Sequence, residues 1–373
     1  MKLVNLLKSL IKIVILFFRR FKMPMSFGGV SKKVVATKIV AVDGTGDFTD
    51  IQTAVNALPA GGGVVYVKEG TYTITTAISI TSDNVSIIGA GKSTKIQTTA
   101  DISLIHADTV LGIFIEKVWI HGSGAGNLNN KGIYFENVSN SSVTDCWFDN
   151  IGTYGIHCEG GNTNYFSGND MTTCLVVGIY AKTSDYNLID SNRIYSCKIG
   201  VNLDHSDYDI VQNNVIYSNV WDGILSYYAD YNIYTGNQVY ANEDRGIAIT
   251  SSRHCVVSGN LIKDNDVNNT ATHDGIYISM SSYNNITGNR CYNNDRYEIN
   301  VWEDSSNRNV VVGNNCYGTD HVGMINDNGT GTIIEANYPP AGTHYWSCSG
   351  HNFKGIDHGA TPELYFYEFD GQS

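Results

Sequence analysis

The sequence has few prolines and few charged residues, and its cysteines lack the spacing of metal or redox motifs. Its 373 residues include 5 prolines and 16% charged side chains, and no two of the 8 cysteines form a C-x-x-C pair. Zinc ribbons, thioredoxin-like motifs and c-type haem attachment all need closely paired cysteines, so these classes are disfavoured. A hydrophobic content of 42% argues against a disordered chain.

Positive charge is scarce beyond the N-terminus. Residues 1–33 contain eight lysines and arginines and no acidic residue. The remaining 340 residues contain 16 basic and 36 acidic side chains, which gives this part a formal charge of −20. Such a body repels phosphate backbones, so we expect no nucleic-acid partner.

Residues 1–33 form a basic, apolar segment that we separate from the fold. Its apolar run, Leu10–Phe18, is followed directly by two arginines and is shorter than the roughly 20 residues that a membrane span needs. Three interpretations stay open. The segment is an export signal, an interfacial anchor that contacts a membrane through residues 1–22, or sequence upstream of a true start at Met23 or Met25.

A short motif, Gly-Ile or Gly-Val followed by alternating residues, recurs at steps of 22–25 residues with one step of 29. Its positions, two of them altered, are Gly132, Gly155, Gly178, Gly200, Gly223, Gly246, Gly275, Glu298 and Gly323. A column of asparagines has the same period, at Asn169, Asn192, Asn214, Asn237, Asn260, Asn289 and Asn314. Short alternating segments without helical periodicity lie between the two columns.

A period of about 23 residues with strands of 3–5 residues predicts an all-β solenoid, the parallel β-helix, in which each repeat is one coil. We assign residues 34–336 to it. Equivalent positions then stack ~4.8 Å apart, and the asparagines form an internal ladder of hydrogen bonds. An amphipathic helix at 50–58, with Thr49 or Asp50 as its N-cap, would cover the first coil. The aromatic segment 337–373 would cap the other end, with a strand at Leu364–Phe369.

Two further columns follow from the same period. Tyrosines six residues before the asparagines should stack on one another, at Tyr186, Tyr208, Tyr231 and Tyr283. Cysteines occupy equivalent positions in successive coils, as Cys174 with Cys197 and Cys291 with Cys316. These pairs are interpreted as buried thiols, with inter-coil disulfides as the alternative.

Strand alternation places the second and fourth residues after each glycine on the outer face. In the first four coils these positions mix aromatic, acidic, basic and amide side chains, as a saccharide-binding groove would. The candidate catalytic residues are Tyr154, His157, Glu159, Lys182 and Asp204. The candidate substrate-binding residues around them are Tyr134, Glu136, Tyr180, Asn202, His205 and Tyr227. A solvated strand face with mixed charges is the alternative.

The 29-residue step marks a second candidate region. Six extra residues fall within 264–273, and inserted loops of solenoids often bind ligands. His273 and Asp274 would stack over Arg245 and Asp222 and extend the substrate-binding set. A tolerated polar insertion with paired surface charges is the alternative.

The segment Val42–Phe48 (VDGTGDF), continued through Gly70–Tyr72 (GTY), resembles the start of the pectate-lyase-like superfamily. That superfamily includes pectin methylesterases, alginate C5-epimerases, polysaccharide lyases and phage tailspikes. The resemblance implies a right-handed parallel β-helix over about residues 39–335. Ile356–Pro362 (IDHGATP) is similar to a motif of phage tail-fibre ends.

Alginate C5-epimerases carry the motif Tyr-Gly-Phe-Asp-Pro-His-Glu on one strand and an Asp on the next coil. The matching segment is Tyr154–Glu159 (YGIHCE), followed one coil later by Lys182. Tyr154 matches the catalytic tyrosine of that family. His157 stands at its Asp position, Glu159 at its His position and Lys182 at its second Asp position. The motifs of pectin methylesterases and galacturonases are absent, so the resemblance leaves the reaction open.

Two mechanisms are consistent with these residue types. In an elimination or epimerisation on a polyuronate, Lys182 would neutralise the uronate carboxylate, His157 would abstract the C5 proton, and Tyr154 would donate a proton. In a hydrolysis, Glu159 and Asp204 would act together, two coils and roughly 9–10 Å apart.

We therefore expect an extracellular, cell-surface or virion protein that binds acidic polysaccharide or a cell-surface glycan and modifies it as a lyase or epimerase. The alternative is a non-catalytic adhesin, surface-layer protein or tailspike, the last of which would be a homotrimer. No metal ligand set or cofactor is predicted. Calcium stays open, because Asp204, Asp207 and Asp209 are close in sequence but match no known calcium loop.

Overall fold

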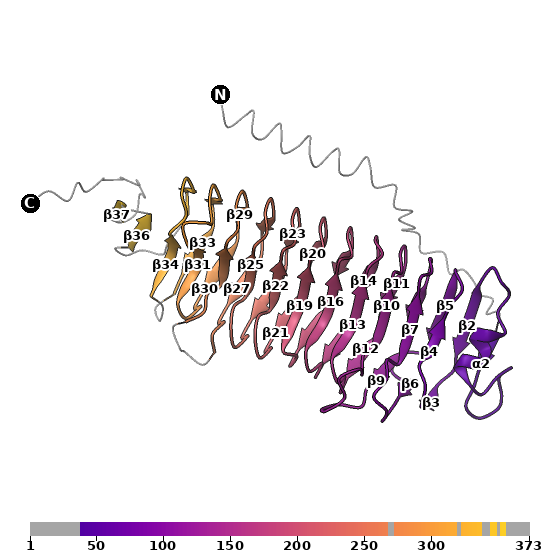
Figure 1. The fold of residues 1–373 in the computed structure, drawn as a ribbon. Coiled ribbons are helices and arrows are strands. Elements are labelled where there is room, and N and C mark those ends of the chain that lie inside the picture. The colour runs from indigo at the N-terminus through magenta and orange to yellow at the C-terminus, as the bar shows by residue number, and fades with distance from the viewer. Residues whose placement is uncertain (1–37, 268–271, 319–321, 338–343, 349–350, 356–373) are drawn as a thin grey trace, which may run out of the picture. The chain divides into compact units, whose positions relative to one another are not determined.

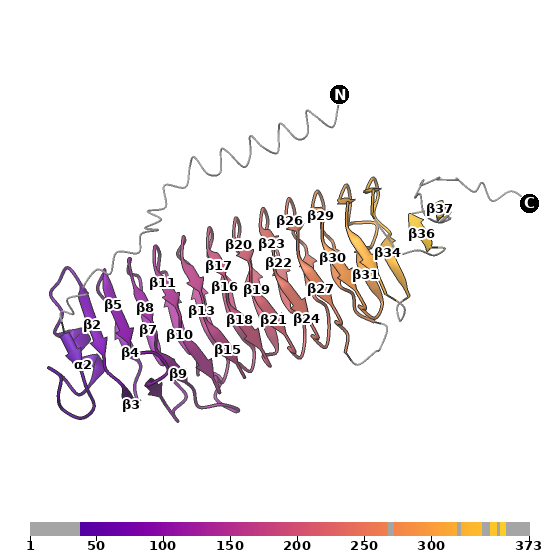
Figure 2. The same cartoon turned by 180° about the vertical axis from the view of Figure 1, so that it is seen from behind.

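The computed structural model describes residues 38–267, 272–318, 322–337, 344–348 and 351–355. The predicted segment 1–33 and most of 337–373 lie outside these residues, including the predicted strand Leu364–Phe369 and the motif at Ile356–Pro362. The described chain is a parallel β-helix, with successive coils stacked one behind another (Figures 1 and 2). None of its helices is long and apolar enough to cross a membrane.

Three sheets run along the stack, and a typical coil contributes one strand to each sheet. The 13 strands of sheet A are β1 (Lys38–Val40), β2 (Gly63–Val67), β5 (Val85–Gly89), β8 (Phe114–Glu116), β11 (Ser142–Thr144), β14 (Tyr165–Ser167), β17 (Leu188–Asp190), β20 (Ile210–Gln212), β23 (Ile233–Thr235), β26 (Val256–Ser258), β29 (Asn285–Thr287), β32 (Val310–Val312) and β35 (Ile333–Glu335). The 11 strands of sheet B are β3 (Gly70–Thr73), β6 (Thr94–Gln97), β9 (Trp119–His121), β12 (Trp147–Asp149), β15 (Asp170–Thr172), β18 (Arg193–Tyr195), β21 (Val215–Tyr217), β24 (Gln238–Tyr240), β27 (Leu261–Lys263), β30 (Arg290–Tyr292) and β33 (Asn315–Tyr317).

Sheet C contains the Gly-Ile strands of the repeat. Its 13 strands are β4 (Ile78–Ile80), β7 (Ile105–Asp108), β10 (Ile133–Glu136), β13 (Tyr154–Glu159), β16 (Val177–Lys182), β19 (Ile199–Asp204), β22 (Ile224–Tyr227), β25 (Ile247–Thr250), β28 (Ile276–Ser279), β31 (Tyr297–Trp302), β34 (Gly323–Asp327), β36 (His344–Cys348) and β37 (His351–Gly355). All pairings are parallel except β36 with β37, which is antiparallel. The alternating inward residues of the three sheets form one continuous apolar core.

A six-residue helix, α2 (Ile51–Asn56), lies at the β1–β2 end of the stack (Figure 1). Asp50 is its N-cap, and the Asp50 carboxylate accepts a 2.7 Å hydrogen bond from the amide of Thr53. Ile51, Ala54 and Val55 are buried, and the helix contacts β1, β2 and β4. The helix is therefore shorter than the predicted 50–58, but it buries the apolar face that the sequence pattern indicated.

The predicted asparagine column forms a buried ladder that links consecutive coils. The amide oxygen of Asn214 accepts hydrogen bonds from both the backbone N (2.9 Å) and Nδ2 (3.0 Å) of Asn192. The Nδ2 of Asn214 donates in turn to Asn237 and to the carbonyl of Ile189. The same pattern continues along the column to Asn337. Each side chain thus satisfies backbone groups at a turn that no strand partner reaches.

Two further amide columns were missed by the sequence analysis. One contains Asn219, Asn242, Asn265 and Asn294. The other contains Asn164, Asn187, Asp209, Asn232, Asn284 and Asn309. Both columns follow the coil period. The second was not recognised because it is not a continuous run of asparagines, as Asp209 shows. Together, the three ladders support the turns between the sheets.

The glycine column is explained by the close approach of neighbouring coils. A Cβ atom on Gly223 would lie 2.4 Å from Val239 and 2.7 Å from the carbonyl oxygen of Gly246 in the next coil. Glu298 replaces glycine near the end of the stack, where its carboxylate accepts a hydrogen bond from Nδ2 of Asn294. Burial raises the pKa of Glu298 to about 8. The altered repeat at this position therefore terminates an amide ladder.

The other columns have the predicted arrangement, with one addition. Tyr186, Tyr208 and Tyr231 stack at ring distances of 5.0 and 4.9 Å. His254 occupies the position that lacks a tyrosine and stacks between Tyr231 and Tyr283. The seven cysteines with described side chains are all free thiols, so the interpretation as buried thiols is confirmed for Cys174 with Cys197 and for Cys291 with Cys316.

The amide ladder should contribute strongly to stability. Replacing Asn214 with Ala leaves two buried donors of Asn192 without an acceptor, at a cost of about 2–5 kcal/mol in unfolding free energy. Urea denaturation measures this change. The exposed Gln238→Ala variant is the control, for which we expect a change within about 0.5 kcal/mol. Equal stability of the two variants would contradict a structural role of the ladder.

Asp209 should make the stability of the fold depend on pH. Burial raises the pKa of this carboxyl from 3.8 to about 8. Between about pH 4 and 8 the folded state therefore holds a proton that the unfolded chain releases, so its stability falls as the pH rises. We expect Asp209→Asn to be more stable than the original protein at pH 8 and to lose this advantage towards pH 4. Denaturation at both pH values tests this, and a difference that does not change with pH would contradict it.

Candidate functional site

Four neighbouring strands of sheet C bring the candidate catalytic residues together. The parallel register of β10, β13, β16 and β19 aligns Tyr134, His157, Tyr180 and Asn202 in one column. It aligns Glu136, Glu159, Lys182 and Asp204 in a second column. The coil period therefore predicted the arrangement of these positions. Tyr154 precedes Gly155 at the start of β13 and lies beside the first column.

The first column is a stack of aromatic rings. Tyr134 and His157 lie 4.8 Å apart and His157 and Tyr180 lie 5.0 Å apart, in both cases nearly parallel. His106, which the sequence analysis did not single out, stacks on the other face of Tyr134 at 4.8 Å. Tyr154 packs against both His157 and Tyr180. The rings thereby cover each other's faces, and mainly their edges remain for a ligand.

His157 is on the outer side of the sheet, yet it is only 5% exposed. Neither of its ring nitrogens makes a hydrogen bond within the described chain, and Nε2 lies 3.7 Å from Glu159. Burial lowers the pKa of His157 to about 4, and the nearby Lys131 lowers it further while Glu159 opposes the shift. The imidazole is therefore neutral at physiological pH, but its access to solvent is less than strand alternation alone suggested.

The second column is a network of carboxylates with specific partners. Glu159 accepts hydrogen bonds from Lys182 at 2.6 Å and from the hydroxyl of Tyr134 at 3.1 Å. The bond from Lys182 lowers the pKa of Glu159, so this carboxylate stays ionised. Asp204 accepts a 2.7 Å bond from the hydroxyl of Tyr180 and contacts His205 at 2.7 Å. An ionised Glu159 is poorly suited to be the general acid of a hydrolysis.

Glu136, at the start of the second column, pairs with His106 at 3.0 Å. At the opposite end of the predicted set, Asn202 carries a buried amide oxygen without a hydrogen bond in the described chain. Tyr227 is exposed and contacts the rings of Tyr228 and His205 edge-on. These residues extend the polar and aromatic surface along sheet C on both sides of Tyr154.

Lys131 belongs to this site and was missed. Its ammonium lies 4.0 Å above the centre of the Tyr134 ring. Burial lowers the pKa of Lys131, while Glu159 and Glu136 oppose the shift. A signal was available in the sequence, because Lys131 directly precedes Gly132 and so occupies the same column as Tyr154, one coil earlier. The residues predicted from this column came only from other coils.

Tyr154 differs from the two tyrosines beside it. The hydroxyls of Tyr134 and Tyr180 are bound to carboxylates, whereas the hydroxyl of Tyr154 makes no hydrogen bond within the described residues. Burial raises the pKa of Tyr154, and Lys182 opposes that shift. Tyr154 therefore has a half-buried, protonated hydroxyl that is free to interact with a ligand.

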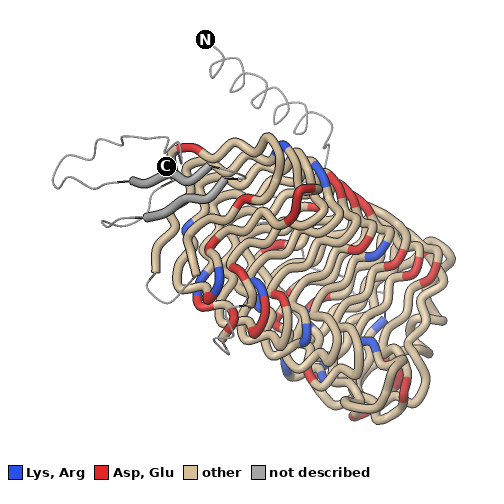
Figure 3. Tube along the Cα trace, turned by 60° about the vertical axis from the view of Figure 1, so that its left-hand side comes forward, with Lys and Arg blue, Asp and Glu red and all other residues tan. Residues whose placement is uncertain are grey.

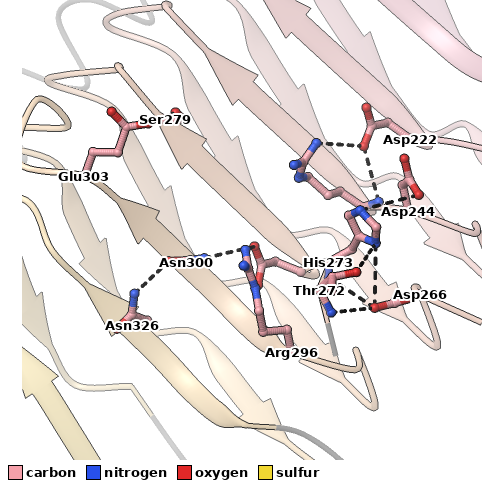
Figure 4. Close-up of polar contacts among 12 residues, drawn as sticks. Asp222, Asp244, Asp266, Thr272, His273, Ser279, Arg296, Asn300, Glu303 and Asn326 are labelled. Carbon is pink, nitrogen blue, oxygen red and sulfur yellow. Dashed lines mark hydrogen bonds and ion pairs between the residues drawn. The ribbon is translucent and has the colours of Figure 1, made fainter. Parts of the chain in front are cut away.

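The second candidate region lies further along sheet C, at the inserted residues (Figure 4). Arg245 donates its backbone N–H to Asp222 at 3.2 Å, and its guanidinium lies 3.7 Å from the same carboxylate. His273 lies 3.6 Å from Asp244. Asp274 is adjacent to Arg245 in the backbone register, but its carboxylate pairs with Arg296 instead. The structure thus groups Asp222, Arg245 and His273 and directs Asp274 to a different partner.

The three aspartates considered for calcium do not converge. Asp207 accepts a hydrogen bond from the backbone of Asp230, and Asp209 is buried within an amide column, while Asp204 is bound by Tyr180. Acidic residues do recur at equivalent places in neighbouring coils, as Figure 3 shows for the charged residues along the chain. Across the described residues, no group of three or more His, Cys, Asp or Glu could hold a metal ion.

Models of known families match three parts of the chain. Residues 131–269 match the right-handed β-helix region, residues 37–140 match pectinesterase, and residues 218–339 match the periplasmic copper-binding protein NosD. A pectinesterase/pectinesterase inhibitor of Arabidopsis thaliana is 28% identical over 142 residues, which are 33% of this chain. That match spans only 25% of the plant protein.

Solved structures share the fold over most of the chain. The A-module of the mannuronan C-5 epimerase AlgE4 of Azotobacter vinelandii aligns with a TM-score of 0.61 at 16% identity, over 80% of this chain and 95% of the module. An exopolygalacturonase of Thermotoga maritima aligns with a TM-score of 0.60 at 13% identity, over 76% of this chain and 87% of the enzyme. The chain thus has the right-handed parallel β-helix fold that the sequence resemblance implied.

The environment of His157 predicts an unusual titration. Its imidazole should lose its proton near pH 4 instead of near 6.5, because burial disfavours the charged ring. Replacing Glu159 with Gln should lower this pKa further, since the carboxylate is the group that favours the charged form. Histidine NMR resonances followed from pH 3 to 8 measure both effects. A midpoint near 6.5 would show that the ring is solvated and would contradict the stacked arrangement.

Proposed function

We propose that this chain is a polysaccharide-modifying enzyme that acts on an acidic glycan. The reaction takes place on sheet C around Tyr154, His157 and Lys182, which we call the Tyr154 site. Proteins of the same fold that act on polysaccharides support the general class. The specific proposal is removal of the proton at C5 of a uronate, followed by elimination or epimerisation. The observation that carries it is the unbound hydroxyl of Tyr154, whose ring packs against the neutral His157 and whose acidity is influenced by the cation Lys182.

The site contains several carboxylates, so only its two lysines can attract an anionic sugar. Lys182 interacts with Glu159 and electrostatically with Tyr154, while Lys131 lies over the ring of Tyr134. A uronate carboxylate placed beside Tyr154 would attract both ammonium groups. Neutralising that carboxylate acidifies the C5 proton, because the negative charge that develops on proton removal is then stabilised.

The proton transfers can be assigned as follows. His157 takes the C5 proton, and the C5 electron pair moves toward the neutralised carboxylate. In an elimination, a C4–C5 double bond forms, the C4–O bond breaks, and the leaving oxygen takes the proton of the Tyr154 hydroxyl. In an epimerisation, C5 instead regains a proton on its opposite face, from Tyr154. Because the ring nitrogens of His157 are buried, the scheme requires Tyr154 or Tyr134 to shift when substrate binds.

A hydrolysis by Glu159 and Asp204 is a weaker proposal. A general acid should have a raised pKa, but the bond from Lys182 lowers the pKa of Glu159. The intervening Lys182 also occupies the space between these two carboxylates in the column. We therefore favour proton abstraction over glycosidic hydrolysis at this site.

An extracellular, cell-surface or periplasmic location is part of this proposal. The match to a periplasmic protein model over residues 218–339 supports it. The free thiols of the described chain place no requirement on an oxidising compartment. A surface adhesin or a trimeric tailspike would have the same fold without chemistry at Tyr154, so the alternatives differ in activity.

Activity on alginate and polygalacturonate tests the proposal. Wild-type protein should generate unsaturated uronates, seen by ultraviolet absorbance, or inverted C5 configuration, seen by NMR. Tyr154→Phe removes only the hydroxyl and should lower the rate by about 100-fold or more. Tyr186→Phe, in the exposed tyrosine stack, is the matched control and should keep full activity. A folded wild-type protein without either product would favour the adhesin or tailspike alternative.

A further inference from the structure

A second group of titratable side chains lies where the coil repeat contains its extra residues. Asp222, Asp244, Arg245 and His273 come from three successive coils, at the edge where the chain enters β22, β25 and β28. Figure 4 shows Asp222, Asp244 and His273 in one cluster. None of them contacts a residue of the Tyr154 site. The mechanism proposed for Tyr154 therefore leaves this cluster unexplained.

Asp222 and Asp274 occupy the same column, two coils apart, and both are almost fully buried. Asp274 has a complete set of partners. Its carboxylate accepts hydrogen bonds from Nε of Arg296 at 2.8 Å, from a second nitrogen of the same guanidinium, and from Nδ2 of Asn300 at 3.0 Å. A buried carboxylate with this many donors is a structural ion pair.

Asp222 has much weaker partners. It accepts one backbone hydrogen bond from Arg245 at 3.2 Å, and the nearest guanidinium nitrogen of that residue is 3.7 Å away. The Arg245 side chain instead stacks on the ring of Tyr277 at 4.2 Å, and its Nε has no acceptor. A buried carboxylate with so little compensation is costly to keep charged.

The surroundings of Asp222 disfavour the charged form of its carboxyl group. Burial is the main cause that raises the pKa of Asp222 to about 6; the charge of Asp244 raises it further, while Arg245 and His273 oppose the shift. Asp244 is more exposed and faces Nε2 of His273 at 3.6 Å. The other ring nitrogen of His273 lies 3.7 Å from Asp266. Asp266 also accepts hydrogen bonds from the backbone amides of Thr272 and His273, which holds these two residues against the cluster.

An aromatic surface suited to a sugar ring adjoins the two carboxylates. Trp221 directly precedes Asp222 and is 45% exposed. The ammonium of Lys198 covers one of its faces at 3.5 Å, which positions the indole. Exposed aromatic rings beside polar groups are typical of saccharide sites.

We propose that Asp222 and Asp244 form an acid/base pair that hydrolyses a glycosidic bond, at a centre separate from Tyr154. Asp222 donates its proton to the glycosidic oxygen as the bond between that oxygen and the anomeric carbon breaks. Asp244, oriented by His273, takes a proton from the water whose oxygen bonds to the anomeric carbon. The products are two shorter saccharides, one with a new reducing end, and one water is consumed. Such a hydrolysis needs one carboxyl group that donates a proton to the leaving oxygen and a second that accepts a proton from the attacking water.

Hydrolysis is distinguished from elimination by its products. Wild-type protein is incubated with polygalacturonate, alginate, xylan and chitosan, and reducing ends are compared with unsaturated uronates. The proposal predicts reducing ends in excess of unsaturated product on at least one polymer. Asp222→Asn and Asp244→Asn should each lower this excess by about 100-fold or more. Glu243→Gln changes the adjacent acidic residue and should leave it unchanged. No excess on any polymer, or an unchanged excess in Asp222→Asn, would overturn the proposal.

A structural role is separated from catalysis by stability and pH dependence. Asp274→Asn should lower the denaturant midpoint, because it breaks the ion pair between this buried carboxylate and the half-buried Arg296. Asp222→Asn should not lower it at pH 7, because the carboxylate it removes is poorly compensated.

The hydrolytic rate should fall as the pH rises through about 6, where Asp222 loses its proton. Strong destabilisation by Asp222→Asn, or a rate that does not depend on pH in this range, would instead assign Asp222 to the fold.

Discussion

The hydrogen bonds between stacked asparagine side chains are the interaction on which this fold depends. Each coil changes direction between its sheets, and the backbone groups at those turns have no partner within a strand. In the column through Asn214, the amides accept from the coil before and, up to Asn314, donate to the coil after. The regular spacing of the coils, and with it the alignment of side chains on sheet C, follows from this repeated connection.

That regularity explains why the sequence predicted so much of the fold. Equivalent positions recur every 22–25 residues, so a side chain's column can be read directly from its distance to the nearest glycine. The register of Glu159 with Lys182 and the stacking of Tyr186 on Tyr208 both follow from this rule. The rule fails where another residue type takes a place in a column, as His254 and Asp209 do. The rule also does not predict how exposed a side chain is. The low exposure of His157, for example, is determined by the rings above and below it.

The sequence predicted which residues form the candidate site more completely than it predicted how these residues interact. Sequence alternation identified Tyr154, His157 and Lys182, but it could not reveal that Lys182 is bound to Glu159. Nor could it distinguish the free hydroxyl of Tyr154 from the bound hydroxyls of Tyr134 and Tyr180, since all three are tyrosines on one face. Lys131 was missed although its place directly before Gly132 could be read from the sequence, and its contact with the Tyr134 ring now marks it as part of the site.

We propose above all that sheet C binds an acidic sugar beside Tyr154. A crystal structure of the protein with a short oligouronate tests this most directly. We expect a sugar carboxylate between Lys131 and Lys182, with the Tyr154 hydroxyl within hydrogen-bond distance of the sugar. An oligosaccharide bound only at another surface, with Lys182 still paired to Glu159 and Tyr154 without a ligand, would contradict it.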